Sequence, residues 1–200
     1  MATAGLEACD WRDPAYLAAG SPAQRAAARA LAACGVLERL APFDPVLAGT
    51  YPLDLAVEGS DLDVLCHAPD LALFERAVRE ALGDRPGFRC ERQPAGTTPA
   101  VIARFRSGRL PVEVFGQPLP IDRQRGYRHL LVEARLLARG GARLRRAVAA
   151  LRRSGLKTEP AFARALGLEG DAYERLWTLS WREANELDAL LAAAGFPRRA

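Results

Sequence analysis

The sequence has few of the side chains that bind zinc. It contains four cysteines and two histidines among 200 residues. No two cysteines have the C-x-x-C spacing typical of a zinc site. We therefore expect no zinc centre and interpret the cysteines as buried thiols of a reducing compartment. The four residues are Cys9, Cys34, Cys66 and Cys90.

Long apolar runs are also missing. No uninterrupted apolar stretch approaches the length of a membrane span, and the first residues have neither a basic start nor an apolar run. From these absences we expect a soluble, cytoplasmic protein with no signal peptide and no membrane partner. Hydrophobic residues make up 50% of the chain, which is enough for a well-buried core.

The chain has a single lysine, Lys157, so arginine carries nearly all of the positive charge. The net charge is +4, but residues 123–157 hold ten arginines and one lysine against one acid, Glu133. That segment therefore carries +10 and the remainder −6. It forms either a solvated face or a groove for phosphates. Since aromatic residues are sparse in it and no nucleic-acid-binding motif accompanies it, we favour nucleotide phosphates and leave a nucleic acid as the less favoured partner.

The most informative stretch runs from residue 46 to residue 67. A short apolar run ends at Gly49-Thr50, and Asp61 and Asp63 follow shortly before a second apolar run. Side chains alternate between the two faces of a strand, so Asp61 and Asp63 project from the same face. Two such carboxylates repel each other unless a cation lies between them, and oxygen ligands suit Mg²⁺ or Mn²⁺. The opposite, core-facing side is then formed by Leu62, Val64 and Cys66.

Three small residues near these acids suit a phosphate loop. Gly49 lets a backbone approach a phosphate closely, and the Thr50 hydroxyl can bond to a phosphate oxygen. The alternative is that Gly49, Thr50 and Ser60 are turn residues that let the strands reverse. Ser60 can equally serve only to cap the turn that presents Asp61.

This arrangement resembles the nucleotidyltransferase superfamily that includes DNA polymerase beta, over about residues 16–179. The superfamily signature is a strand ending in Gly-Ser, a connector, Asp-x-Asp on the next strand, and a third carboxylate on a later strand. Thr50 replaces the usual Ser and keeps its hydroxyl. Residues 51–57 alternate like a strand where many members have a short helix. With the later Glu-x-Phe-Gly-Gln segment at residues 113–117, the pattern most resembles a family of small bacterial nucleotidyltransferase-like proteins with no assigned function.

The resemblance gives Glu113 the place of the third carboxylate, although a lone glutamate in a strand is usually exposed to solvent. On that basis Asp61, Asp63 and Glu113 are the expected catalytic residues and the expected ligands of Mg²⁺ or Mn²⁺. Glu113 would also be the base that activates an acceptor hydroxyl.

Three basic side chains of the C-terminal half are further candidates for binding the nucleotide: Arg128, His129 and Lys157. His129 and Glu133 lie at i and i+4 on one helix face, a spacing that commonly gives a surface or interhelical hydrogen bond but could instead orient His129 towards a ligand. Lys157 precedes Thr158 at a predicted helix N-terminus, which favours anions. The alternative there is a plain cap with an exposed lysine.

The expected fold class is α+β, a nucleotidyltransferase-like mixed sheet flanked by helices and followed by a C-terminal helical part. We expect a catalytic core over residues 1–120 and a helical region over residues 121–200 packed on it, or one continuous domain. A tight turn is predicted at Ser107-Gly108, and a loop at residues 93–99. Besides the two strands flanking the connector, strands are predicted at 88–93, 100–106 and 110–115. Helices are predicted at 21–40, 70–82, 121–139, 142–153, 159–166 and 171–194.

The leading functional hypothesis is a metal-dependent nucleotidyltransferase. It would move a nucleoside monophosphate from a nucleoside triphosphate, with ATP the first choice, to a hydroxyl of an unidentified acceptor. A competing hypothesis is a non-catalytic module that binds nucleotide or protein, such as an antitoxin-like regulator. A third is pyrophosphoryl transfer, as in alarmone synthetases of the same superfold.

Overall fold

The structure is a computed structural model that describes residues 6, 9–93 and 98–198. Its contacts divide the chain into two units. The sheet unit consists of residues 11–54 and 58–127, and the helical unit of residues 1–10, 55–57 and 128–200. The domain boundary expected near residue 120 stays a prediction. Most of the loop expected at residues 93–99 lies outside the described residues.

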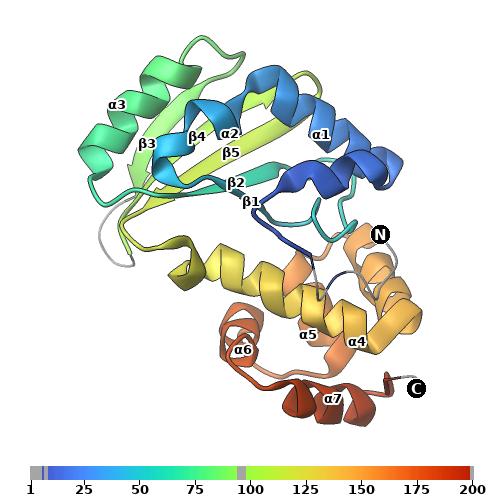
Figure 1. Cartoon of the computed structure of the whole chain (residues 1–200). Helices are drawn as coiled ribbons and strands as arrows, with labels where there is room; N and C mark the ends of the chain where they lie inside the picture. Colours follow the sequence, from blue (N-terminus) through green and yellow to red (C-terminus); the bar gives the residue numbers. More distant parts are fainter. Residues whose placement is uncertain (1–5, 7–8, 94–97, 199–200) are drawn as a thin grey trace. The chain divides into compact units, whose positions relative to one another are not determined.

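The sheet unit is built on five strands in the order β1-β2-β5-β4-β3. β2 and β5 are parallel, whereas the other three neighbouring pairs are antiparallel. The sheet is therefore mixed, and with helices on it the α+β prediction is confirmed (Figure 1). The strands are β1 Val46–Ala48, β2 Leu62–His67, β3 Arg89–Gln93, β4 Ala100–Ser107 and β5 Leu110–Gln117.

Two helices, α1 (Pro22–Cys34) and α3 (Leu71–Leu82), pack on one face of this sheet. Ser21 is the N-cap of α1 and Pro22 follows it, as the Ser-Pro sequence predicts, and Gln24 completes a capping box with Ser21. The predicted helix over residues 21–40 is interrupted, because Gly35 has a left-handed backbone that ends α1 before the short α2 (Val36–Arg39). The sheet unit also has three 3-10 helices, at Pro14–Ala19, Ala41–Phe43 and Ile121–Arg123.

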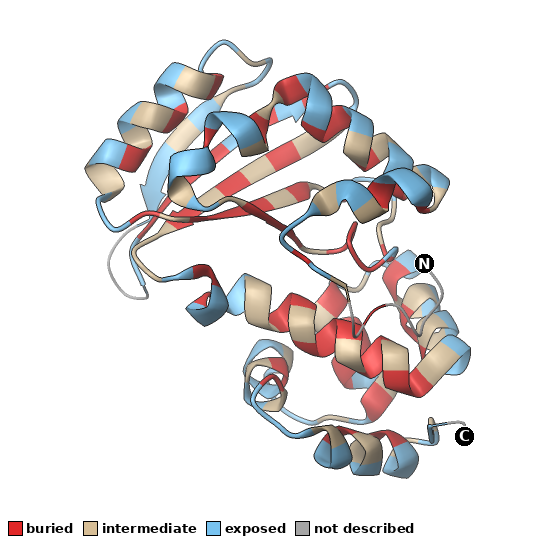
Figure 2. Cartoon of the chain, viewed as in Figure 1, coloured by how far each residue is buried: buried red, intermediate tan, exposed pale blue. Residues whose placement is uncertain are grey.

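Burial alternates along β5 and so separates the two faces of the sheet (Figure 2). Val112, Val114 and Gly116 are buried, and a Cβ added at Gly116 would meet the ring of Phe74 on α3. Residue 116 therefore needs glycine so that α3 can approach the strand. Glu113 lies between these positions and projects from the opposite face.

The connector from Tyr51 to Val57 has no strand, although its alternating pattern resembled one. Pro52 cannot donate a backbone hydrogen bond to a sheet, and Asp54 has a φ of 57°, which a strand excludes. The apolar residues of the pattern are nevertheless buried, because the connector forms turns whose side chains enter the core. They are Tyr51, Leu53 and Leu55.

The helical unit contains most of α4 (Arg125–Arg153), together with α5 (Thr158–Leu166), α6 (Ala172–Leu179) and α7 (Ala184–Ala193). Gly141 has a non-helical φ of 64° and kinks α4 close to the break predicted after residue 139. No helix in the described part of the chain is long and apolar enough to cross a membrane.

The prediction of one helix over residues 171–194 is wrong. Arg128 binds both the hydroxyl and the carbonyl oxygen of Ser180, which closes the end of α6. Glu183 then starts α7 through a capping box with Glu186. Side chains with local hydrogen-bonding capacity thus restart the helix where hydrophobic periodicity alone predicts continuity.

Candidate functional site

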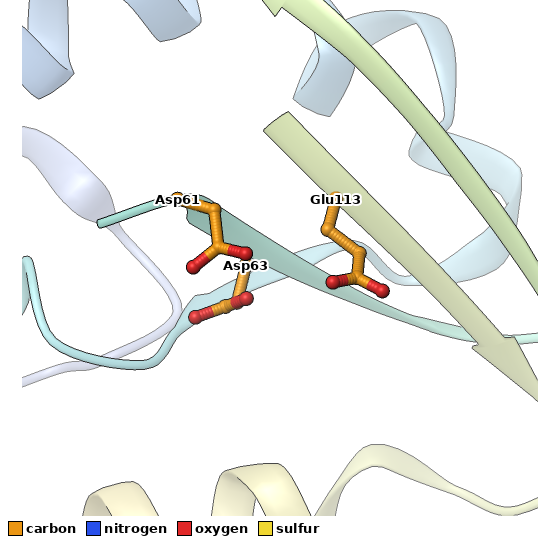
Figure 3. A group of neighbouring side chains, drawn as sticks. All are labelled: Asp61, Asp63 and Glu113. Atoms are coloured by element: carbon orange, nitrogen blue, oxygen red, sulfur yellow. The ribbon is translucent and has the colours of Figure 1, made fainter. Parts of the chain in front are cut away.

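Three carboxylates meet on the sheet unit, on the face opposite α1 and α3. Asp61, Asp63 and Glu113 each offer one oxygen atom, and these three oxygens lie within 4.8 Å of one another (Figure 3). All three side chains are of intermediate exposure, so their carboxylates are neither buried nor fully solvated. In the described part of the chain this is the one group of three or more such side chains that could hold a metal ion.

The sheet register brings these residues together. Asp63 on β2 and Glu113 on β5 are direct partners of the parallel pair, and Asp61 immediately precedes β2. Leu62 and Val64 are fully buried on the other face, so the strand cannot turn its acids inward. The alternating pattern of the sequence thereby fixes the direction in which the carboxylates point.

Gly49 supports this arrangement through its missing side chain. It has a φ of 71°, and a Cβ at this position would lie 1.9 Å from Oδ2 of Asp63. A residue larger than glycine would therefore displace the carboxylate or the loop. The absence of a side chain at residue 49 thus lets the backbone pass directly beside the Asp63 carboxylate.

Thr50 and Ser60 flank the connector and are both buried, each with 8% of its surface exposed. The Tyr51 hydroxyl donates a hydrogen bond of 3.4 Å to the Ser60 carbonyl and so joins the two ends of the connector. Burial first, and then the nearby Asp61 carboxylate, raise the pKa of Tyr51. Tyr51 thus stays a neutral donor that fixes the turn before Asp61. The alternation of residues 51–57 marked Tyr51 as apolar but gave no sign of this hydrogen bond.

Arg104 is a residue of the site that the sequence did not indicate. It lies opposite Glu113 in the antiparallel pair of β4 and β5. Its Nη2 donates to Oε1 of Glu113 at 2.7 Å, and its Nη1 donates to Oε1 of Glu91 at 2.5 Å. The third carboxylate is therefore already paired with a cation.

The remaining candidates, Arg128, His129 and Lys157, belong to the helical unit. Nδ1 of His129 lies 3.1 Å from Oε1 of Glu159, and its Nε2 lies 3.1 Å from the carbonyl oxygen of Tyr173. His129 is thus bonded to α5 and α6, rather than to Glu133 on its own helix. Arg128 also lies over the ring of Trp181, 3.7 Å from its centroid. Lys157 is the exposed N-cap residue of α5, so Thr158 is the first helical residue rather than the cap.

A site of this composition can hold a divalent cation, because its three carboxylates supply hard oxygen ligands. A carboxylate in such a position can also accept a proton from an attacking hydroxyl.

Comparison with known protein families finds one match for this chain. A family model described as "Domain of unknown function (DUF4269)" matches residues 29–179. No curated protein sequence matches the chain.

Among solved structures, Cid1 poly(U) polymerase bound to MgGTP superposes with a TM-score of 0.48 and 16% identity, covering 77% of this chain and 47% of that protein. The polymerase core of TRAMP, an RNA surveillance complex, gives a TM-score of 0.40 and 14% identity, covering 90% of this chain and 59% of that one. This chain therefore spans less than two thirds of either structure.

Proposed function

The chain belongs to the family of domains of unknown function DUF4269, and we propose that it is a metal-dependent nucleotidyltransferase. The observation that carries the proposal is the meeting of three carboxylates from two neighbouring parallel strands, with their oxygens within 4.8 Å. A glycine loop in contact with one of the carboxylates supports it. Repulsion among three acids on one face is what a bound divalent cation would offset.

Asp61, Asp63 and Glu113 would hold Mg²⁺ or Mn²⁺. The metal, when bound, would neutralise charge on a triphosphate during an in-line displacement. Glu113 would accept the proton of the acceptor hydroxyl, whose oxygen forms a bond to the α-phosphorus. The bond from that phosphorus to the pyrophosphate oxygen breaks, and pyrophosphate leaves. ATP is the proposed donor, and the acceptor is a hydroxyl compound.

The phosphates of the donor would lie against Gly49, Thr50 and Ser60. The expected nucleotide contacts of Arg128, His129 and Lys157, which belong to the helical unit, stay predictions. Lys157 is the strongest candidate of the three, because it is exposed at the start of a helix, where anions are favoured. The side chains of Arg128 and His129 are engaged within the helical unit.

Replacing both Asp61 and Asp63 by Asn tests the metal site. In the absence of metal the double variant should melt at the same temperature as the wild type or higher, because it lacks a like-charge pair. The wild type should gain about 5 °C or more with Mg²⁺ and ATP at saturating concentration, by mass action. The double variant should gain nothing. Melting curves of both proteins, with and without Mg²⁺ and ATP, provide the measurement.

Two results would contradict the proposal. A shift induced by Mg²⁺ and ATP that survives in the double variant would mean that the ligands bind elsewhere. A double variant that is destabilised with or without metal would mean that the acids are structural groups bonded to the turn. In either case the hypothesis of a non-catalytic binding module becomes the better explanation of what the protein does.

A further inference from the structure

Arg104 belongs to a row of charged residues that runs across three strands. It is the direct partner of Glu113, and Glu113 is the direct partner of Asp63. Direct partners in a sheet project from the same face. Arg104 therefore stands beside the carboxylate site, one strand away from Glu113 and two strands away from Asp63.

The guanidinium of Arg104 bridges two acids with two different nitrogen atoms. Nη2 binds Glu113, and Nη1 binds Glu91 on β3. Glu113 has 24% of its side chain exposed and Glu91 has 63%. The bridge thus links the carboxylate site to a solvated acid on the outermost strand, beyond β4. Lysine, with one ammonium group, could not reproduce this planar fork.

The two hydrogen bonds of Arg104 use different nitrogen atoms. Nη1 donates to Glu91 at 2.5 Å, and this bond does not use the nitrogen that binds Glu113. Glu91 is therefore a partner in its own right, which can hold the guanidinium when Glu113 does not. The bridge has two ends, and one of them lies away from the carboxylate site.

We propose that Arg104 is a positioning residue that holds Glu113 while the site has no metal, and that it withdraws to Glu91 when a divalent cation binds. This inference rests on the proposed metal site. In the metal-free protein the guanidinium offsets repulsion among the three acids and fixes the carboxylate of Glu113 opposite Asp63. A divalent cation at the same carboxylate repels the guanidinium. Arg104, whose side chain is 48% exposed, then keeps its hydrogen bond to the solvated Glu91.

A titration with Mn²⁺ alone tests the proposal through opposite effects of two substitutions. Arg104→Met removes the competing cation, so the affinity for Mn²⁺ should increase about three- to tenfold. Glu91→Gln removes the alternative partner, so Arg104 stays on Glu113 and the affinity should decrease about two- to threefold. Electron paramagnetic resonance of free Mn²⁺ provides the measurement and needs no acceptor substrate.

The two variants lose the same Arg104–Glu91 ion pair. If that pair only stabilised the sheet, both variants should therefore change Mn²⁺ binding in the same direction or not at all. Either of those results would overturn the proposal.

Arg106→Met is the matched control. Arg106 lies two residues along β4 on the same face and donates to the carbonyl oxygen of Arg109 rather than to Glu113. Its loss should change the affinity for Mn²⁺ by less than about twofold. An effect as large as that of Arg104→Met would show a general charge effect and would overturn the specific role of Arg104.

The melting temperature without metal gives a second readout. Arg104→Met should lower it, because the three carboxylates lose their cation, and Mn²⁺ should restore it to the wild-type value. A variant that is equally stable in both conditions would contradict the holding role.

The Asp61→Asn, Asp63→Asn protein separates the role of Arg104 from the proposed metal site. If the wild type binds Mn²⁺ no better than this protein, the metal site itself fails. If it binds better and the Arg104 and Glu91 variants do not diverge, only the role of Arg104 fails.

Discussion

Replacing Gly49 tests whether the position of the Asp63 carboxylate affects metal binding separately from the stability of the sheet unit. Its added Cβ would lie 1.9 Å from Oδ2 of Asp63, whereas a Cβ at Gly59 would meet nothing within 4 Å. The two glycines have similar backbones, with φ of 71° and 82°. They therefore share the cost of a positive φ and differ in the contact with Asp63.

Gly49→Ala should lose Mn²⁺ binding, and Gly59→Ala should keep it. Both variants should be destabilised by about 1–2 kcal/mol through the left-handed backbone, with a further loss at Gly49 from the displaced carboxylate. Urea unfolding and Mn²⁺ titration of the two purified variants provide the comparison. Equal Mn²⁺ binding by the two proteins would show that the position of Asp63 does not matter to the metal.

At the same scale, alternation in the sequence was sufficient to predict the direction of Asp61 and Asp63, but not the role of Arg104. A turn at Ser107-Gly108 would place Ile102 opposite Glu113. In the structure Gly108 and Arg109 form the turn, so the partner of Glu113 is Arg104. Moving a two-residue hairpin turn by one residue moves every partner by two. A turn prediction that is wrong by one residue therefore cannot identify Arg104 as the partner of Glu113.

At the scale of elements, helix starts were easier to predict than helix interruptions. The neighbouring residues Ser21 and Pro22 are enough to predict the start of α1, because a helix cap and its first turn involve residues close in sequence. The break between α6 and α7 depends on Arg128, which lies 52 residues before Ser180. The periodic apolar positions continue through the break, and Leu176, Leu187 and Leu191 are all buried. A contact between distant residues closes the end of α6, and only the start of α7 has a local signal, the capping box of Glu183 with Glu186.

Helices α4 and α5 enclose a buried acid that the proposed mechanism does not use. Glu133 on α4 has 3% of its surface exposed, and its Oε1 has no hydrogen-bond partner among the residues that the structure describes. Burial, and then the charge of Glu159 on α5, raise the pKa of Glu133 well above its ordinary value, while Arg152 acts in the opposite direction. His129 and Tyr173 complete the polar surroundings through their contacts with Glu159. The fold therefore disfavours the ionised form of Glu133.

Glu133→Gln should make the protein more stable at pH 8 and leave it unchanged at pH 4. Below its ordinary pKa of about 4.5, Glu133 is protonated in both the folded and the unfolded chain. As the pH rises towards the raised folded pKa, only the unfolded chain releases the proton, so the wild type loses stability and the amide variant does not. We expect an advantage of a few degrees in melting temperature at pH 8, since about 1 kcal/mol corresponds to roughly 2–4 °C in a chain of this size.

Melting curves from pH 4 to pH 8 measure this difference. Glu80→Gln, at an exposed position of α3, serves as the control and should show no such trend. If Glu133→Gln is instead the less stable protein at pH 8, Glu133 is ionised in the fold and paired with Arg152.

At the scale of the whole molecule, several arginines of residues 123–157 are engaged in contacts that stabilise the fold. Arg139 makes a two-point ion pair with Asp188 on α7, at 2.6 and 2.5 Å, and is itself buried. Arg152 donates to the carbonyl oxygens of Leu55 and Leu156. Arg135 donates to the carbonyl oxygen of Arg182, and Arg128 is held at Ser180. These four arginines stabilise contacts within the helical unit, so the segment offers less positive charge to a polyanion than its composition indicates.

Nucleic-acid binding should accordingly be weak, while triphosphate binding depends on metal. At about 150 mM salt we expect dissociation constants for tRNA or duplex DNA no tighter than about 10 μM, within the range of non-specific binding. Fluorescence anisotropy with labelled tRNA and duplex DNA between 50 and 300 mM NaCl measures both the affinity and its slope. The same protein should bind ATP with Mn²⁺ at a salt dependence that reflects only a few charges. Tight binding that falls steeply with salt would show that the exposed arginines form a continuous track for a nucleic-acid backbone. It would make nucleic acid the favoured partner.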